Sequence, residues 1–195
     1  MSERSHIVPG QYGKNPGGVE LAAVTIPWAW NIQGRGARGG LPRELARIEL
    51  PTEPNTMASA DGVTAAWLGP GSWLLVGHAP PAVPFAQASA ALDAAGAALF
   101  EVSASRVAYR IGGPRAVDVL AALCPLDFHP GVFGLGTCAQ SVFGHVNALI
   151  VRPAGGNAFV VLVACSFGRD VWHGLCATAA EYGYEVQQET AWPAG

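Results

Sequence analysis

The sequence predicts an α+β fold made of two duplicated β-β-α-β halves, with antiparallel sheets and helices packed on them. Short runs of β-branched and aromatic residues, separated by Gly and Pro turns, indicate strands. Two longer segments that end at Gly96 and Gly183 indicate helices. The same order of elements occurs twice at an offset of roughly 85 residues, as expected of a duplicated architecture.

The two halves are residues 63–102 and 146–186. The expected elements of the first half are strands 63–68 and 72–76, helix 85–95 and strand 99–102. The corresponding elements of the second half are strands 146–151 and 158–163, helix 167–182 and strand 184–186. Because β-β-α-β is a common order, an accidental similarity is the alternative to duplication.

The remaining segments complete one domain over residues 19–195. Residues 1–18 show almost no apolar periodicity and predict an extended or flexible N-terminal arm. The other expected elements are strand 24–33, helix 42–50, loop 55–62, strand 106–111, helix 114–123 and the irregular segment 125–136. A length of 195 residues is enough to bury a core without a metal or a disulfide.

Charged residues are scarce, which predicts that another protein covers part of the surface. Only 13% of the chain is Asp, Glu, Lys or Arg, against roughly 25% in ordinary domains. Gly and Pro interrupt the uncharged stretch between Asp61 and Asp93 too often for a membrane-spanning helix. The net charge is −3 and the eleven basic residues form no stripe for phosphates. We therefore expect neither a membrane nor nucleic acid as a partner.

The cysteines favour a cytoplasmic protein with reduced thiols. They form no C-x-x-C pair, and residues 1–18 lack the apolar core of a signal peptide. Cys124 with His129 and Cys138 with His145 match no zinc-ligand spacing, so no metal site is expected.

The sequence contains no arrangement typical of catalysis. Residues 34–39, GRGARG, match a dinucleotide-binding string, but Pro51 stops the helix that follows and the βαβ alternation is missing. A G-x-S-x-G nucleophile motif is absent, and the acidic residues are scattered singly. We predict no catalytic residue on this chain, and its cofactor-binding residues stay unassigned.

Two tryptophans and two arginines near the N-terminus are candidates for contacts with a partner. Trp and Arg are enriched at the centres of protein interfaces. We therefore expect Trp28, Trp30, Arg35 and Arg38 to be exposed partner contacts. The alternative is that both tryptophans belong to the core of this chain.

Several stretches, taken in order, resemble the gamma subunit of heterotetrameric sarcosine oxidase. They are LPTEPNT at 50–56, AWLGPGSWLLV at 66–76, VSASR at 102–106, GPR at 113–115, CPLDFHP at 124–130, CAQ at 138–140 and SF at 166–167. The resemblance covers roughly residues 20–186, and linked motifs are more specific than any single string.

This resemblance implies a fold related to the folate-binding domain of the glycine-cleavage aminomethyltransferase. It also implies a non-catalytic structural or assembly subunit, with alpha, beta and delta subunits as partners. Such a complex oxidatively demethylates sarcosine to glycine and transfers the one-carbon unit to tetrahydrofolate. The resemblance places FAD, FMN, NAD and tetrahydrofolate on the other subunits and no cofactor on this chain.

One position departs from the aminomethyltransferase pattern. Those enzymes carry a strand beginning Gly-x-Val-Asp-Asp, whose carboxylate faces the folate, whereas residues 144–148 here are GHVNA. Asn147 cannot act as a base, which argues against folate chemistry on this chain. The alternatives left open are a stand-alone folate-binding one-carbon transferase and the same subunit in a complex that oxidises another N-methyl amine.

Overall fold

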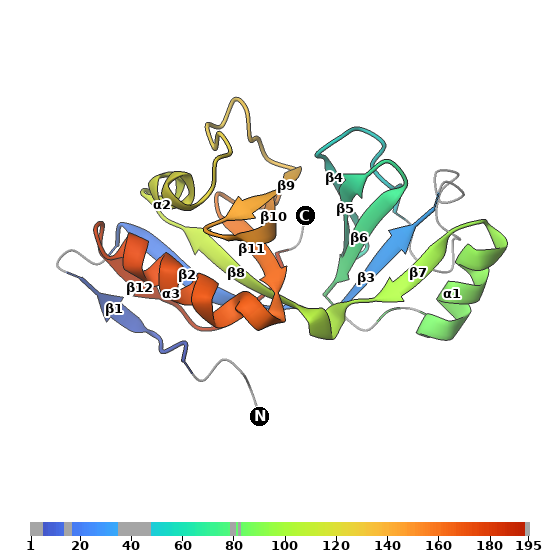
Figure 1. The fold of residues 1–195 in the computed structure, drawn as a ribbon, viewed down its shortest axis with the longest axis horizontal. Helices are drawn as coiled ribbons and strands as arrows, with labels where there is room; N and C mark the ends of the chain where they lie inside the picture. Colours follow the sequence, from blue (N-terminus) through green and yellow to red (C-terminus); the bar gives the residue numbers. More distant parts are fainter. Residues whose placement is uncertain (1–5, 14–16, 35–47, 79–80, 82, 194–195) are drawn as a thin grey trace.

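Two β-sheets stand side by side, and helices cover the outer face of each (Figure 1). The computed structural model describes residues 6–13, 17–34, 48–78, 81 and 83–193. Sheet A contains, in spatial order, β1 (Gly10–Tyr12), β12 (Tyr184–Val186), β2 (Val19–Thr25), β8 (Arg106–Gly112), β11 (Phe159–Ala164), β10 (Val146–Arg152) and β9 (Thr137–Phe143), with β13 (Thr190–Ala191) beside β2. Sheet B contains β4 (Met57–Ala60), β5 (Val63–Gly69), β6 (Ser72–Gly77), β3 (Trp28–Gln33) and β7 (Ala98–Glu101).

The two predicted halves correspond in three of their four elements. Strands β5 and β6 with the helix after them match β10 and β11 with theirs, whereas the fourth strands differ, because β7 pairs with β3 and β12 pairs in parallel with β2. The order β4-β5-β6-β3 in sheet B is matched by β9-β10-β11-β8 in sheet A. Helix α1 (Phe85–Ala94) follows β6 as α3 (Gly168–Ala179) follows β11, and α2 (Ala116–Leu123) precedes β9. The sheets are not wholly antiparallel, because β2 lies between β8 and β12 and pairs in parallel with β12 and β13.

Three of the expected elements differ in the structure. The loop expected over 55–62 contains strand β4, because residues 57–60 pair antiparallel with β5. The single strand expected over 24–33 is two strands in different sheets, because Pro27 has no N–H for a ladder and the chain leaves sheet A there. Of the helix expected over 42–50, residues 42–47 lie outside the described part. Residues 48–50 are not helical, in line with the restriction that Pro51 places on residue 50. Among the described residues, no helix is long and apolar enough to cross a membrane.

The buried side chains form three clusters. One lies between sheet A and helices α2 and α3, and a second lies between sheet B and α1. The third joins the sheets and contains Leu74 from sheet B with Leu149 and Leu162 from sheet A. Trp192, near the C-terminus, closes this third cluster and donates from Nε1 to Thr64 Oγ1 at 3.3 Å.

The two tryptophans expected on the surface are buried. Trp28 and Trp30 are 6% and 1% exposed and belong to the cluster under α1, with their rings 4.7 Å apart. The expectation that they are exposed is therefore wrong. They alternate along β3 with Ala29 and Asn31, so the indoles point to the helix side of the sheet and Asn31 to the other. Arg35 and Arg38 lie outside the described residues, and their contact with a partner stays a prediction.

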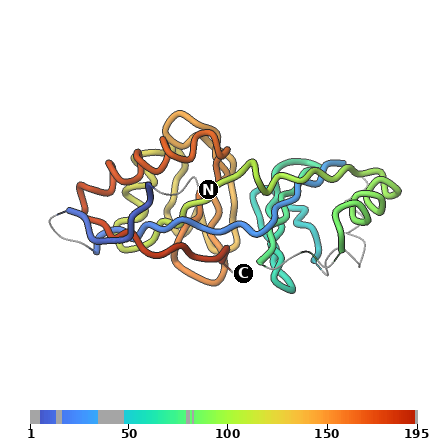
Figure 2. The backbone as a smooth tube through the Cα atoms, turned by 90° about the horizontal axis from the view of Figure 1, so that it is seen from below, coloured from blue at the N-terminus to red at the C-terminus, as the bar shows by residue number. Residues whose placement is uncertain are grey.

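Two chain segments pass from one sheet to the other, β2 into β3 and β7 into β8 (Figure 2). They are bonded where they cross, at the turn η2 (Ser103–Ser105). The Val102 N–H donates to the Ala29 carbonyl at 2.9 Å, and the Ala29 N–H donates to Ser103 Oγ at 2.7 Å. Ser103 Oγ also contacts the Glu101 carboxylate, which accepts the Trp30 indole N–H at 2.7 Å. This group of five residues is called the crossing.

Replacing Ser103 by Ala is expected to lower the free energy of unfolding by about 2 kcal/mol, because the buried Ala29 N–H loses its acceptor. Urea unfolding measures the change. Ser166→Ala, an exposed serine on η3 (Cys165–Phe167), is the control and should leave stability unchanged. Equal stability of wild type and Ser103→Ala would show that the crossing does not hold the sheets together.

Candidate functional site

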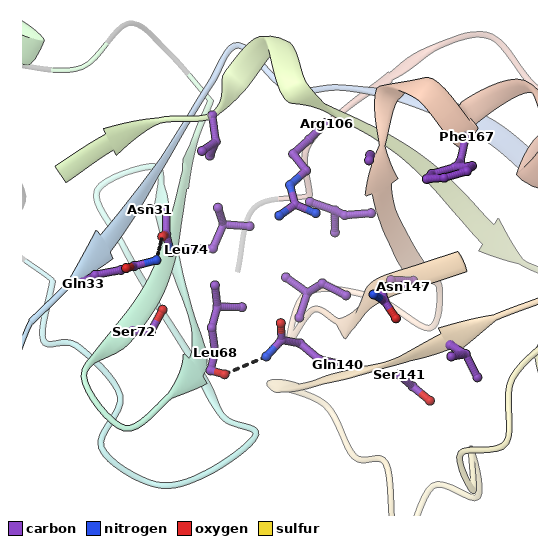
Figure 3. A pocket seen from close by; sticks show the side chains of 16 residues that line it. Asn31, Gln33, Leu68, Ser72, Leu74, Arg106, Gln140, Ser141, Asn147 and Phe167 are labelled. Carbon is purple, nitrogen blue, oxygen red and sulfur yellow. Dashed lines mark hydrogen bonds between the residues drawn. The ribbon is translucent and has the colours of Figure 1, made fainter. Parts of the chain in front are cut away.

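A cleft of about 840 Å³ lies between the two sheets, beside the crossing (Figure 3). Both sheets contribute to its lining, together with Val102 directly before η2 and Phe167 of η3. The 16 lining residues are Asn31, Gln33, Leu68, Ser72, Leu74, Val102, Arg106, Gln140, Ser141, Val142, Asn147, Ala148, Leu149, Leu162, Ala164 and Phe167. The cleft is thus built from segments far apart in the sequence.

The wall formed by sheet B presents amide groups that are held in place. Gln33 donates from Nε2 to Asn31 Oδ1 at 2.7 Å, and Asn31 donates from Nδ2 to the Trp73 carbonyl at 3.0 Å. Asn31 and Gln33 share the cleft face of β3 because side chains alternate along a strand. Leu74, opposite Asn31 in the register, continues the same face as an apolar surface.

The opposite wall is formed by β9 and β10 of sheet A. Gln140 donates from Nε2 to the Leu68 carbonyl at 2.6 Å and so closes one end of the cleft (Figure 3). Asn147 on β10 lies opposite Val142 on β9 in the register, and both line the cleft. The position at which the sequence departs from the aminomethyltransferase pattern is therefore part of this wall.

Arg106 and Phe167 line the other end of the cleft, beside the turns η2 and η3. Arg106 is the first residue of β8, directly after η2, and its guanidinium points into the cleft (Figure 3). It is the single charged residue among the described lining residues and forms no ion pair with any residue that the structure describes. The Phe167 side chain, 43% exposed, lies at the rim.

This set of groups suits binding rather than acid–base chemistry. No carboxylate, imidazole or thiol is found among the described lining residues. Amide and hydroxyl groups together with a cation can orient a polar, anionic molecule. The cleft was not predicted from the sequence. Its residues come together only through the register of the strands and through the crossing.

Other polar side chains also have defined places in the structure. Ser72 lines the cleft, whereas Ser103 belongs to the crossing. His129 accepts the Gly131 N–H at Nδ1 and shapes its own loop. The described residues contain no group of three or more His, Cys, Asp or Glu placed to hold a metal. The GRGARG segment lies outside the described residues apart from Gly34.

The fold is of the duplicated α+β class found in aminomethyltransferases. It is similar to the glycine cleavage system aminomethyltransferase T from Bartonella henselae, with a TM-score of 0.56 and 15% identity, over 89% of this chain and 48% of that one. A similar fold is also found in heterotetrameric sarcosine oxidase from Corynebacterium sp. U-96 in complex with pyrrole 2-carboxylate. There the TM-score is 0.70 and the identity 23%, over 88% of both chains. The predicted fold class is confirmed.

The chain belongs to the sarcosine oxidase, gamma subunit family, because the model of that family matches residues 43–181, more than half of the sequence. It is 27% identical to sarcosine oxidase subunit gamma of Corynebacterium sp. (strain P-1) over 89% of this chain and 86% of the relative. It is 28% identical to the subunit of the same name from an Arthrobacter species, over 84% and 79%. The resemblance inferred from the sequence motifs is confirmed.

A buried thiol joins the two sheets beside the cleft. Cys138 on β9 is fully buried, and its Sγ lies 3.3 Å from the Thr56 carbonyl and 3.4 Å from the Trp67 carbonyl. Burial raises the pKa of the Cys138 thiol from the usual 9.0 to about 11, and the hydrogen bond to Trp67 opposes part of that rise. The folded protein therefore keeps this thiol protonated at pH values at which the unfolded chain ionises it.

This difference in pKa predicts a loss of stability at alkaline pH. Above pH 9 the unfolded chain releases the thiol proton while the folded protein retains it, so unfolding becomes more favourable until about pH 11. Two pKa units correspond to about 3 kcal/mol. Cys138→Ala should reduce the fall in unfolding free energy between pH 9 and 11, whereas Cys165→Ala, at a half-buried site, should not. Parallel curves for wild type and Cys138→Ala would contradict this account.

Proposed function

We propose that this chain is a structural subunit of a sarcosine oxidase-type complex and acts by packing against its partners. The observation that supports this proposal most strongly is the match of the family model to residues 43–181. Under this proposal the complex oxidatively demethylates sarcosine to glycine and transfers the one-carbon unit to tetrahydrofolate. The partners are alpha, beta and delta subunits, and they hold the FAD, FMN, NAD and tetrahydrofolate.

The lining of the cleft supports a non-catalytic role over a stand-alone one-carbon transferase. A transferase of the aminomethyltransferase type needs a carboxylate toward the folate, and Asn147 occupies the matching position. No other described lining residue supplies a carboxylate. The substrate would bind on another subunit. A structural role for this chain is therefore equally compatible with a complex that oxidises a different N-methyl amine.

The loop 125–136 is the surface that we propose for contact with a partner. It projects above α2 and β9 (Figure 1) and carries Val132 and Leu135, which are 65% and 52% exposed. Phe128 and Phe133 hold its base in the core, and Arg152 donates to the Phe133 carbonyl at 2.7 Å. A loop fixed at its base that exposes large apolar side chains is typical of an interaction site. Arg35 and Arg38 are proposed as a second contact.

An affinity pull-down of the tagged chain from its native lysate tests the proposal. The wild type should recover a yellow complex that forms peroxide when sarcosine is added. Val132→Asp should reduce the recovered flavin at least about tenfold, because a carboxylate would be buried without a partner. Val8→Asp is the matched control, since Val8 is similarly exposed but lies in the N-terminal segment, and it should leave the recovery unchanged.

Two results would contradict different parts of the proposal, the membership in a complex and the contact through the loop. A colourless wild-type chain that elutes alone would argue against the complex and favour the folate-binding alternative. Equal recovery with Val132→Asp and wild type would retain the complex and reject the loop as the contact.

A further inference from the structure

We propose that the outer edge of strand β7 in sheet B pairs with an extended strand of a partner subunit. This inference rests on the proposed function, because it describes one way in which a partner is held in the complex. Three observations support it: the direction of the backbone groups of β7, the side chains that this strand carries, and the strands and helix that occupy the corresponding place in sheet A.

The backbone groups of β7 point alternately toward β3 and toward the open edge. The Val102 N–H donates to the Ala29 carbonyl at 2.9 Å, which fixes the phase of the ladder between the two strands. Bonded and unbonded pairs alternate in an antiparallel ladder, so Phe100 is bonded to β3. The N–H and carbonyl groups of Leu99 and Glu101 therefore point away from β3. No strand among the described residues lies on that side of β7.

The side chains of β7 do not prevent pairing with another strand. Natural edge strands are often protected by Lys, Pro or a bulge, whereas β7 has the sequence ALFE and a regular register with β3. Its one charge, the Glu101 carboxylate, accepts the Trp30 indole N–H at 2.7 Å and contacts Ser103 Oγ. Phe100 is 48% exposed, so a large apolar side chain lies beside the unpaired backbone groups. These features favour the addition of a strand.

The corresponding edge of sheet A is occupied. Strand β8 takes the place of β3 in the matching strand order, and the next strand is β2 in sheet A and β7 in sheet B. Beyond β2, sheet A continues with β12 and β1, whereas sheet B ends at β7 among the described residues (Figure 1). A partner strand on β7 would therefore take the place in sheet B that β12 takes in sheet A.

The two helices on these sheets are covered to different extents. Helix α3 has five buried residues, and Tyr184 and Val186 of β12 belong to the apolar cluster beneath it. Helix α1 has two buried residues, Ala88 and Leu92. A strand beside β7 would extend the sheet beneath α1, as β12 extends it beneath α3. We therefore expect the partner segment to alternate apolar and polar residues, as Tyr184, Glu185 and Val186 do, with the apolar ones facing α1.

Hydrogen–deuterium exchange tests this pairing at single residues. The amides of Leu99 and Glu101 would be measured in the complex recovered with the tagged chain and in the full-length chain alone. In the complex they should exchange at least about a hundredfold more slowly, because the partner strand supplies their acceptors. The Phe100 amide is bonded to β3 in both states, so it should change little and is the internal control.

A substitution on the same edge gives a second measurement. Phe100→Lys should reduce the flavin recovered with the tagged chain at least about tenfold, because a lysine on an edge strand opposes the addition of another strand. Val8→Lys, the same charge at another exposed apolar residue, should leave the recovery unchanged. Equal recovery with Phe100→Lys and wild type would contradict the pairing. If Phe100→Lys does not fold, as judged from its thermal unfolding, the exchange measurement on the wild type decides.

The exchange results separate this inference from the role in assembly. A yellow complex in which the Leu99 and Glu101 amides exchange as fast as in the chain alone would overturn the pairing and leave the role in assembly intact. A colourless chain that elutes alone would contradict both. Slow exchange of these amides in the chain alone, lost on dilution, would show that β7 pairs with a second copy of this chain and would also overturn the proposal.

Discussion

The hydrogen-bonded crossing of the two long chain segments is the feature on which the rest of the structure depends. Ala29 and Ser103 bring together segments that each run through both sheets, and the Glu101 carboxylate ties this point to the buried indole of Trp30. The crossing sets the relative position of the two walls, so the apolar cluster between the sheets can close. It also places Asn31 and Arg106, each a few residues from the crossing in sequence, in the same cleft.

The composition of the chain is explained by this architecture. Strands such as β6, β10 and β11 are buried along most of their length because one face meets a helix and the other meets the second sheet. Such strands carry few charges, which accounts for part of the low charge that the sequence shows. Two of the seven large apolar side chains that are exposed among the described residues, Val132 and Leu135, lie in the loop 125–136, which is why this loop is our candidate for a covered surface.

Local patterns were sufficient to predict most of the strands and helices, whereas contacts between distant segments were not predictable. The hairpin at Gly71 and the helix ends at Gly96 and Gly183 follow from glycines with positive φ, which sequence reasoning uses directly. The change of sheet at Pro27 and the burial of Trp28 depend instead on tertiary pairing. For the same reason the cleft could not be predicted, although Asn147 had been singled out from the resemblance.

The assignment of this chain to a complex rests on family membership. The most direct test is to purify the enzyme activity and to ask whether this chain is present in the active complex. Sarcosine-oxidising activity would be purified from the native organism without any tag, and the active fraction would be analysed by native mass spectrometry. The account predicts that this 20.1 kDa chain is present in the active complex, in a fixed ratio to larger flavin-containing subunits. An active complex that contains the larger subunits but lacks this chain would contradict it.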